Sequence, residues 1–173
     1  IKDYFGDGKR FHVPIRYSDE GDRQLGTAGA LKLAEPLLAD SFFVLFGDTF
    51  LMVDYGAIMS YFQGQSHPAL MTVYRNENRY DTSDVIVENE LVTVYDKTHP
   101  RSDMVHINAG LSVVRKNAMA FIPPCKPISV QQFFGEFISM KQLLAFEVSQ
   151  RFYEIGSFSG LSEFQNLVDK ESL

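Results

Sequence analysis

One glycine-containing stretch and one acidic residue carry the first chemistry that this sequence indicates. Gly26, Thr27 and Gly29 open a helix-forming run, and Asp48 follows the apolar run 42–46. Glycines let the backbone approach a flat or anionic ligand closely, because no Cβ intervenes. A carboxylate at the end of a buried strand is a natural ligand for a hard cation such as Mg²⁺. The pattern therefore predicts a nucleotide site with a divalent metal beside it.

A loop, a helix and a buried strand must position these groups. We expect a helix to begin at Thr27, whose hydroxyl would cap it and leave free N–H groups at the first turn. The run 42–46 is apolar throughout, as in a strand covered on both faces. Loop, helix, strand and strand-end carboxylate, in this order, indicate a nucleotide site in an open α/β sheet. Taken separately, Gly-x-x-Gly and Gly-Asp are more typical of ordinary turns.

The rest of the chain alternates between strand and helix signals. Strands are expected at 11–17, 69–74 and 105–115, and hairpins at 85–88 with 91–95 and at 143–148 with 151–155. Helices are expected at 55–63 after the N-cap Asp54, at 117–122, at 130–140 after the N-cap Ser129, and at 159–168. Because the hairpins add antiparallel strands to alternating strands and helices, we expect an α/β fold with a mixed sheet.

Composition and charge exclude several classes of protein. A chain of 173 residues is the size of one domain. Its net charge of −6 argues against nonspecific binding to nucleic acid or to an anionic membrane. No apolar run approaches the roughly 18 residues that a membrane span needs. The single Cys125 excludes an internal disulfide framework and favours a cytoplasmic location.

Two motifs in their observed order resemble the sugar-phosphate nucleotidylyltransferases. Residues 25–31 (Leu-Gly-Thr-Ala-Gly-Ala-Leu) resemble that family's base-recognition loop, and residues 46–48 (Phe-Gly-Asp) resemble its metal-binding strand end. The resemblance is greatest to the guanylyl- and related transferases that act on mannose 1-phosphate or heptose 1-phosphate. It implies a Rossmann-like mixed sheet of the nucleotide-diphospho-sugar transferase type. It also implies transfer of a nucleotidyl group, guanylyl in the first instance, from a nucleoside triphosphate to a sugar 1-phosphate, with release of pyrophosphate.

The resemblance implies a role for each matching residue. Nucleotide binding falls to Leu25, Gly26, Thr27 and Gly29. Mg²⁺ binding falls to Asp48 and Glu154, and catalysis to Asp48 and Lys97. Sugar binding falls to Asn108, Gly110 and Tyr74.

Four of these assignments depart from a full match or have an ordinary structural reading. Glu154 stands where the family has aspartate, and the reading without function is a solvated strand-end carboxylate. Lys97 lies in Tyr-Asp-Lys-Thr, which resembles the family's Glu-Lys-Pro, and the alternative is a surface lysine. Asn108 and Gly110 would also suit a β-bulge with a buried polar side chain, and Tyr74 would suit the core.

The beginning of the chain reads as the interior of an element. Residues 1–8 resemble the end of a helix closed by glycine. In the resembled family a strand and a Gly-rich signature loop precede this segment. We therefore expect one nucleotidyltransferase domain over 1–173 without its N-terminal βα portion, and little transferase activity from this chain alone. We also expect an exposed strand edge that a second copy covers, giving a homo-oligomer.

Two other functions are compatible with parts of the pattern. One is a non-catalytic nucleotide-sugar-binding or regulatory relative, which Glu154 favours. The other is an unrelated Rossmann-type binding module. That module would need a Gly-x-Gly-x-x-Gly turn after a strand, which this sequence lacks.

Overall fold

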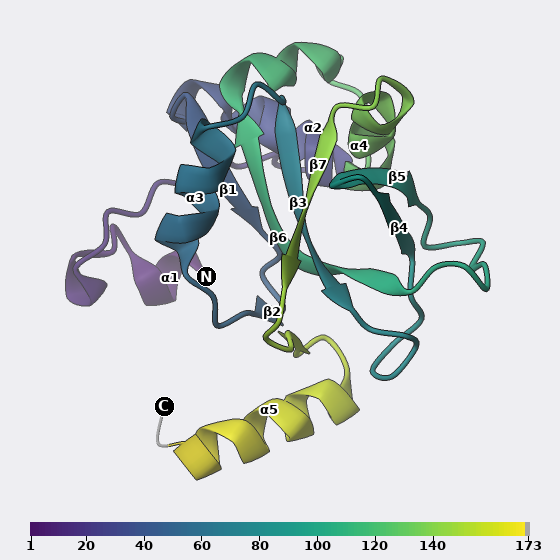
Figure 1. Ribbon diagram of the computed structural model, residues 1–173. Coiled ribbons are helices and arrows are strands. Elements are labelled where there is room, and N and C mark those ends of the chain that lie inside the picture. The colour runs from purple at the N-terminus through teal and green to yellow at the C-terminus, as the bar shows by residue number, and fades with distance from the viewer. Residues whose placement is uncertain (172–173) are drawn as a thin grey trace.

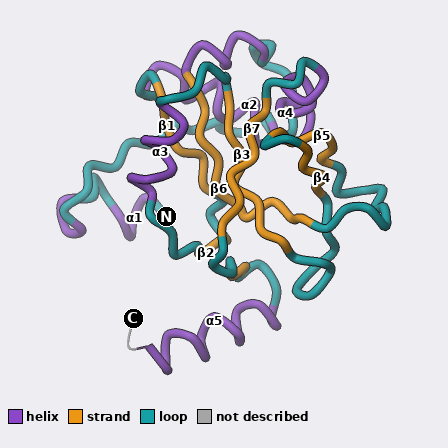
Figure 2. The backbone as a smooth tube through the Cα atoms, viewed as in Figure 1, coloured by secondary structure: helices purple, strands orange, loops and turns teal. Residues whose placement is uncertain are grey.

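The computed structural model describes residues 1–171, in which a six-stranded mixed sheet has helices on both faces (Figures 1 and 2). The strand order is β1-β6-β3-β7-β5-β4. The pair β3–β7 is parallel, and the other neighbouring pairs are antiparallel. The strands are β1 (Ser41–Leu45), β3 (Ala69–Arg75), β4 (Val85–Glu88), β5 (Leu91–Tyr95), β6 (His106–Arg115) and β7 (Leu143–Val148). The mixed α/β sheet predicted from the sequence is confirmed.

A second, two-stranded sheet lies at one end of the first. It pairs β2 (Thr49–Phe50) with β8 (Tyr153–Glu154) in antiparallel fashion. Figure 1 shows it between the end of the main sheet and the C-terminal helix α5 (Phe158–Glu171). The remaining short elements are the helix α1 (Lys2–Phe5) and the 3-10 turns η1 (Lys9–Phe11), η2 (Glu35–Leu37) and η3 (Lys116–Phe121).

Two hydrophobic clusters hold the helices to opposite faces of the main sheet. The helices α2 (Gly26–Ala34) and α4 (Val130–Ser139) share a cluster with one set of strand residues. The helix α3 (Tyr55–Gln63) belongs to the other cluster. Alternate residues of β3 supply the two clusters, Met71 the first and Leu70 the second, because successive side chains point to opposite faces of a strand.

Local chemistry accounts for several element boundaries. The side chain of Asp54 accepts a hydrogen bond from Ala57 N at 2.9 Å and caps α3, which spans the predicted residues 55–63. Ser129 and Gln132 form a reciprocal capping box at the start of α4. Asn89 and Glu90 both have positive φ, 51° and 62°, as a tight β4–β5 turn requires. The predicted hairpin 85–88 with 91–95 is confirmed.

Two expected features are wrong. Residues 11–17 form no strand, since His12 has a left-handed φ of 58° and Pro14 lacks an N–H for pairing. The expected hairpin of 143–148 with 151–155 does not form, because β7 inserts between β3 and β5 and is paired on both sides. The chain beyond β7 pairs with β2 instead, which brings Glu154 opposite Thr49.

Strand β1 forms one edge of the main sheet. Among residues 1–171 it pairs only with β6, and its covering by a second copy stays a prediction. Over the same residues, no helix combines the length and apolar character that a membrane crossing demands. The cytoplasmic location stays a prediction.

Candidate active site

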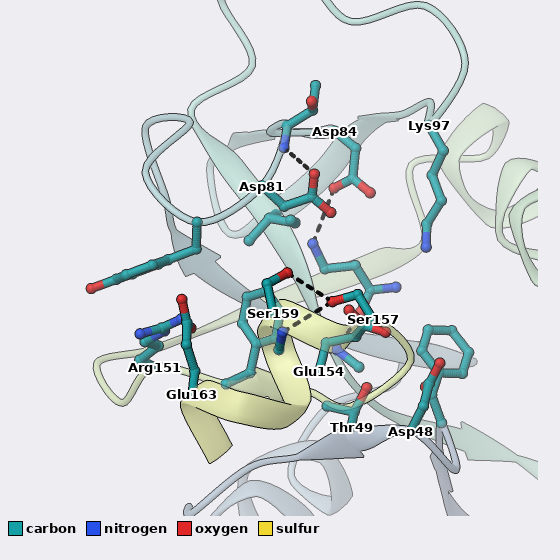
Figure 3. Close-up of a pocket in the computed structure, with 18 residues that line it drawn as sticks. Asp48, Thr49, Asp81, Asp84, Lys97, Arg151, Glu154, Ser157, Ser159 and Glu163 are labelled. Carbon is teal, nitrogen blue, oxygen red and sulfur yellow. Dashed lines mark hydrogen bonds and ion pairs between the residues drawn. The ribbon is translucent and has the colours of Figure 1, made fainter. Parts of the chain in front are cut away.

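A pocket of about 710 Å³ lies between the main sheet, the two-stranded sheet and the start of α5 (Figure 3). Five residues selected from the sequence line it, although they are spread over more than half of the chain. They are Asp48, Lys97, Asn108, Gly110 and Glu154.

Two carboxylates, those of Asp48 and Glu154, converge on one side of the pocket. Pairing of β2 with β8 continues as a hydrogen bond of 2.8 Å from Ile155 N to Asp48 O. A Cβ built on Gly156 would clash with Glu154 Oε1 and would lie 3.3 Å from Asp48 Oδ2. Both carboxylates therefore surround the same glycine backbone. A side chain at position 156 would therefore displace the Glu154 carboxylate from this position.

The donor set formed by Asp48 and Glu154 suits Mg²⁺. Neither carboxylate forms an ion pair with a residue in 1–171. Mg²⁺ characteristically binds through one or two carboxylates and keeps waters or substrate phosphates as its other ligands. No larger group of His, Cys, Asp and Glu side chains that could hold a metal exists in the described part of the chain. The remaining ligands would therefore come from solvent or substrate.

Lys97 brings a positive charge to the pocket. It follows the end of β5, and its Nζ lies 5.6 Å from the centre of the Phe46 ring and 6.0 Å from that of Tyr95. Within residues 1–171 the Lys97 ammonium has no carboxylate partner at ion-pair distance. A compact ammonium without a protein counter-ion suits a phosphate group.

Asn108 and Gly110 form a β-bulge that also lines the pocket. The register of β3 against β6 shifts between Met71 and Val73, and Gly110 has a φ of 84°. Asn108 Oδ1 accepts a hydrogen bond from Gly110 N at 2.9 Å. A Cβ on Gly110 would lie 2.6 Å from Thr49 Cγ2, so glycine lets β6 approach β2. The β-bulge reading of this motif is confirmed, and its sugar-binding role stays a prediction.

Asp84 is a pocket residue that the sequence did not reveal. It is 5% exposed, and its Oδ1 accepts a hydrogen bond of 3.1 Å from Asn108 N. Burial raises the pKa of Asp84 to about 6, although the Asn108 N–H and the Lys97 charge both act to lower it. In the sequence Asp84 ends a charged loop. Only the pairing of Val85 with His106 brings it beside Asn108.

Arg151 is a second pocket residue without a sequence signal. Its guanidinium lies 3.7 Å from the centre of the Tyr80 ring and 4.7 Å from that of Tyr153. It also forms an ion pair with Glu163 of α5. This ion pair ties the first turns of α5 to the edge of the pocket. There the Ser157 hydroxyl accepts a hydrogen bond from Gly160 N at 3.1 Å.

Residues of the Gly-x-x-Gly motif lie outside this pocket lining and pack against the segment before α4. The Ile128 carbonyl accepts hydrogen bonds from Ala28 N at 3.0 Å and from Gly29 N at 3.3 Å. The expected Thr27 cap is wrong, because Thr27 lies inside α2 and its hydroxyl accepts a hydrogen bond from Val130 N at 3.0 Å. The N–H groups of Gly26 and Thr27 have no backbone acceptor outside the helix among residues 1–171, and both residues are exposed.

Tyr74 and Leu25 do not line this pocket, and their binding roles stay predictions. Tyr74 is half-buried and does not line the pocket; its ring lies behind two pocket residues, 6.1 Å from Tyr80 and 6.4 Å from Phe152 between ring centres. Leu25 is 5% exposed, and its carbonyl accepts a hydrogen bond from Ile128 N at 2.9 Å.

Replacing Gly26 with alanine is expected to destabilise the fold by roughly 1–3 kcal/mol. The φ of Gly26 is 68°, and a Cβ there would lie 2.7 Å from Ile128 O. Urea unfolding measures the change in free energy. Gly135→Ala in α4 is the matched control, because a Cβ at Gly135 meets no atom within 4 Å. Equal unfolding midpoints for Gly26→Ala and the unmodified protein would contradict this packing role.

Comparison with known proteins links the chain to one group of enzymes. No protein-family model matches it. It is 27% identical over 139 residues to the UTP–glucose-1-phosphate uridylyltransferase of Synechocystis, a match that covers 71% of this chain and 36% of the relative. It is 26% identical over 157 residues to the D-glycero-alpha-D-manno-heptose 1-phosphate guanylyltransferase of Campylobacter jejuni, covering 90% of this chain and 68% of the relative. The chain thus spans about a third of the first relative and two thirds of the second.

Solved structures give the same picture of the fold. A Bacillus anthracis protein described as a glucose-1-phosphate thymidylyltransferase matches with a TM-score of 0.82 and 17% identity. The match covers 96% of this chain and 70% of that protein. At 17% identity this structural match shows the fold alone. The evidence for homology comes from the two sequence matches given above. The chain is therefore a homologue of the sugar-phosphate nucleotidylyltransferases and has the nucleotide-diphospho-sugar transferase fold.

Proposed function

We propose that the protein transfers a nucleotidyl group from a nucleoside triphosphate to a sugar 1-phosphate, giving a nucleotide-sugar and pyrophosphate. The observation that carries the proposal is that one pocket gathers Asp48, Lys97, Asn108 and Glu154 from separate segments. Two carboxylates and an ammonium that form no ion pair with residues 1–171 suit a reaction between two phosphorylated substrates. The sequence relatives named above, by their own descriptions, act on sugar 1-phosphates.

The proposed reaction asks little covalent chemistry of the protein. An oxygen of the sugar phosphate attacks the α-phosphorus of the triphosphate, the bond to the β-phosphate breaks, and pyrophosphate leaves. Catalysis then consists of positioning and of offsetting negative charge. Lys97 would hold the sugar phosphate, while Asn108 and the Gly110 backbone would hold the sugar. Asp48 and Glu154 would hold Mg²⁺, which when bound neutralises charge on the phosphate oxygens.

The base-binding part of the proposal concerns the start of α2. Gly26 and Thr27 present N–H groups that no backbone acceptor outside the helix occupies within 1–171, so these groups are available to the edge of a base. Leu25 and Gly29 would support this loop through their contacts with Ile128. We propose guanine as the base, because the match to the Campylobacter guanylyltransferase covers 90% of this chain.

Pyrophosphate release tests the proposed function. The full-length protein is mixed with Mg²⁺, each common nucleoside triphosphate and a panel of sugar 1-phosphates, including mannose and heptose 1-phosphate. Release is expected only when both substrates are present, is expected to be fastest with GTP, and should stop when EDTA removes the metal. Absence of release with every pair would contradict the proposal.

A non-catalytic nucleotide-sugar-binding role is the second candidate. Glu154, one methylene longer than the family's aspartate, is the observation that favours it. Binding of a nucleotide-sugar measured by calorimetry, without pyrophosphate release for any substrate pair, would select this role.

A further inference from the structure

The Asp84 carboxylate is a buried acidic group without a role in the transfer chemistry described above. Its Oδ1 is occupied by the Asn108 N–H. No residue in 1–171 donates a hydrogen bond to Oδ2 in the structure, and this atom is not among the buried polar atoms that lack a partner. Asp84 lines the pocket, so Oδ2 is left open to a ligand. Asp84 and Lys97 both line the pocket and lie in the upper part of the view in Figure 3.

The backbone around Asp84 is held firmly on two strands. Asp84 N donates to His106 O at 3.0 Å, and Asp84 O accepts from Asp96 N at 2.9 Å. The carboxylate is thus fixed between β4, β5 and β6. Its position therefore does not depend on the exposed part of the loop before it.

A buried hydrogen-bond network supports the loop that leads into Asp84. Asn76 is fully buried, and its Nδ2 donates to Asp81 O at 2.6 Å and to Ser83 Oγ at 3.1 Å. Ser83 N in turn donates to Asn78 Oδ1 at 2.8 Å. Side chains that are locked by satisfied buried hydrogen bonds present a preorganised surface to a ligand.

We propose that Asp84 is a specificity-determining residue whose free carboxylate oxygen accepts a hydrogen bond from one hydroxyl of the sugar. The inference rests on the proposed function, since it places the sugar of a sugar 1-phosphate in this pocket. Lys97 nearby would engage the phosphate, and Asn108 would contact the same sugar. A fixed, acceptor-only carboxylate selects a hydroxyl donor and rejects an anionic substituent at that position.

The burial of Asp84 explains why a sugar that lacks this hydroxyl would bind more weakly. With a sugar bound, a carboxylate that is only 5% exposed in the empty pocket has little access to bulk water, so a monodeoxy analogue leaves Oδ2 poorly hydrogen-bonded. Removing a donor to a charged, buried acceptor lowers affinity by roughly 10- to 100-fold. The pKa of Asp84, raised by burial to about 6, leaves the carboxylate mainly ionised and accepting at neutral pH.

A binding cycle tests this role without relying on turnover. Calorimetry without nucleotide measures the Kd of a sugar 1-phosphate, called the parent, and of each of its monodeoxy analogues. Both the unmodified protein and Asp84→Asn are measured. Asparagine keeps the size of the side chain and an oxygen that can accept from Asn108 N. One analogue is expected to bind the unmodified protein at least about tenfold more weakly than the parent. Asp84→Asn should show a clearly smaller preference for the parent over that analogue, because it replaces a charged acceptor by a neutral amide.

The controls separate this role from a structural one. Asp40→Asn, at an exposed aspartate before β1, should keep the full preference for the parent sugar. The Kd for the nucleoside triphosphate should be unchanged in Asp84→Asn, whereas a general loss of structure would raise both constants.

The outcomes also distinguish this inference from the proposed function. Equal discrimination among the analogues by Asp84→Asn and the unmodified protein would overturn the role of Asp84, even if pyrophosphate is released. Clearly smaller discrimination in Asp84→Asn would support that role, even if no pyrophosphate is released and the transferase proposal fails. Failure of the unmodified protein to bind any sugar 1-phosphate would overturn the inference.

Discussion

Asp48→Asn is expected to lower the rate of pyrophosphate release by about 10²–10³-fold at fixed Mg²⁺. Asparagine preserves the shape of the side chain but removes one of the two negative charges that surround Gly156. Glu154 would then face the metal alone, and a neutral amide oxygen is a weaker ligand for a hard cation. The measurement is the initial rate as a function of Mg²⁺ concentration, in which the variant should need more metal.

The control for this effect is a second aspartate, which lies outside the pocket. Asp40 is exposed, precedes β1 and lies outside the pocket lining. Asp40→Asn should retain the rate within about twofold, as expected for a surface substitution. A wild-type Mg²⁺ profile in Asp48→Asn would end the assignment of Asp48 as a metal ligand.

Lys97→Met is expected to reduce kcat/KM for the sugar 1-phosphate by about 10²-fold. Methionine keeps most of the length and the apolar stem that lies near Phe46, but removes the charge. The expected signature is a raised KM for the sugar 1-phosphate with the KM for the triphosphate unchanged. Steady-state kinetics with each substrate varied in turn measures this separation.

A distant lysine provides the comparison for Lys97. Lys141 is exposed between α4 and β7 and does not line the pocket. Lys141→Met removes the same charge from the protein, so it reports any effect of net charge alone. If both variants lose activity to the same extent, or if Lys97→Met instead raises the KM for the triphosphate, the proposed contact with the sugar phosphate is wrong.

Local elements were predictable where short-range chemistry decides them. Asp54 and Ser129 cap their helices by bonds to residues three positions later, so no distant partner is needed. Asn89 and Glu90 set the β4–β5 turn in the same local way. The predicted strand at 11–17 was wrong, because a strand also needs a neighbouring strand to pair with, and propensity carries no information about that partner.

Long-range pairing was predictable only in part. The apolar run 143–148 indicated a strand, but its pattern did not say whether the partner would be β3 or the segment after it. Because β7 pairs with β3, residues 153–154 do not pair with β7 and instead pair with β2. The convergence of Asp48 with Glu154 depends on that event, and the family resemblance anticipated it where the local pattern could not.

The sequence by itself determined the α/β class, most helices, and five residues of the pocket lining: Asp48, Lys97, Asn108, Gly110 and Glu154. The class and the helices follow from periodicity and caps, whose information lies within a few neighbouring positions, whereas Lys97, Asn108, Gly110 and Glu154 were selected through the family resemblance. Only the tertiary structure decided that Asp84 and Arg151 join the pocket and that the glycines of the Gly-x-x-Gly motif pack on Ile128. The physical reason is that burial, and with it the raised pKa of Asp84, comes from strand pairing between residues far apart in the chain.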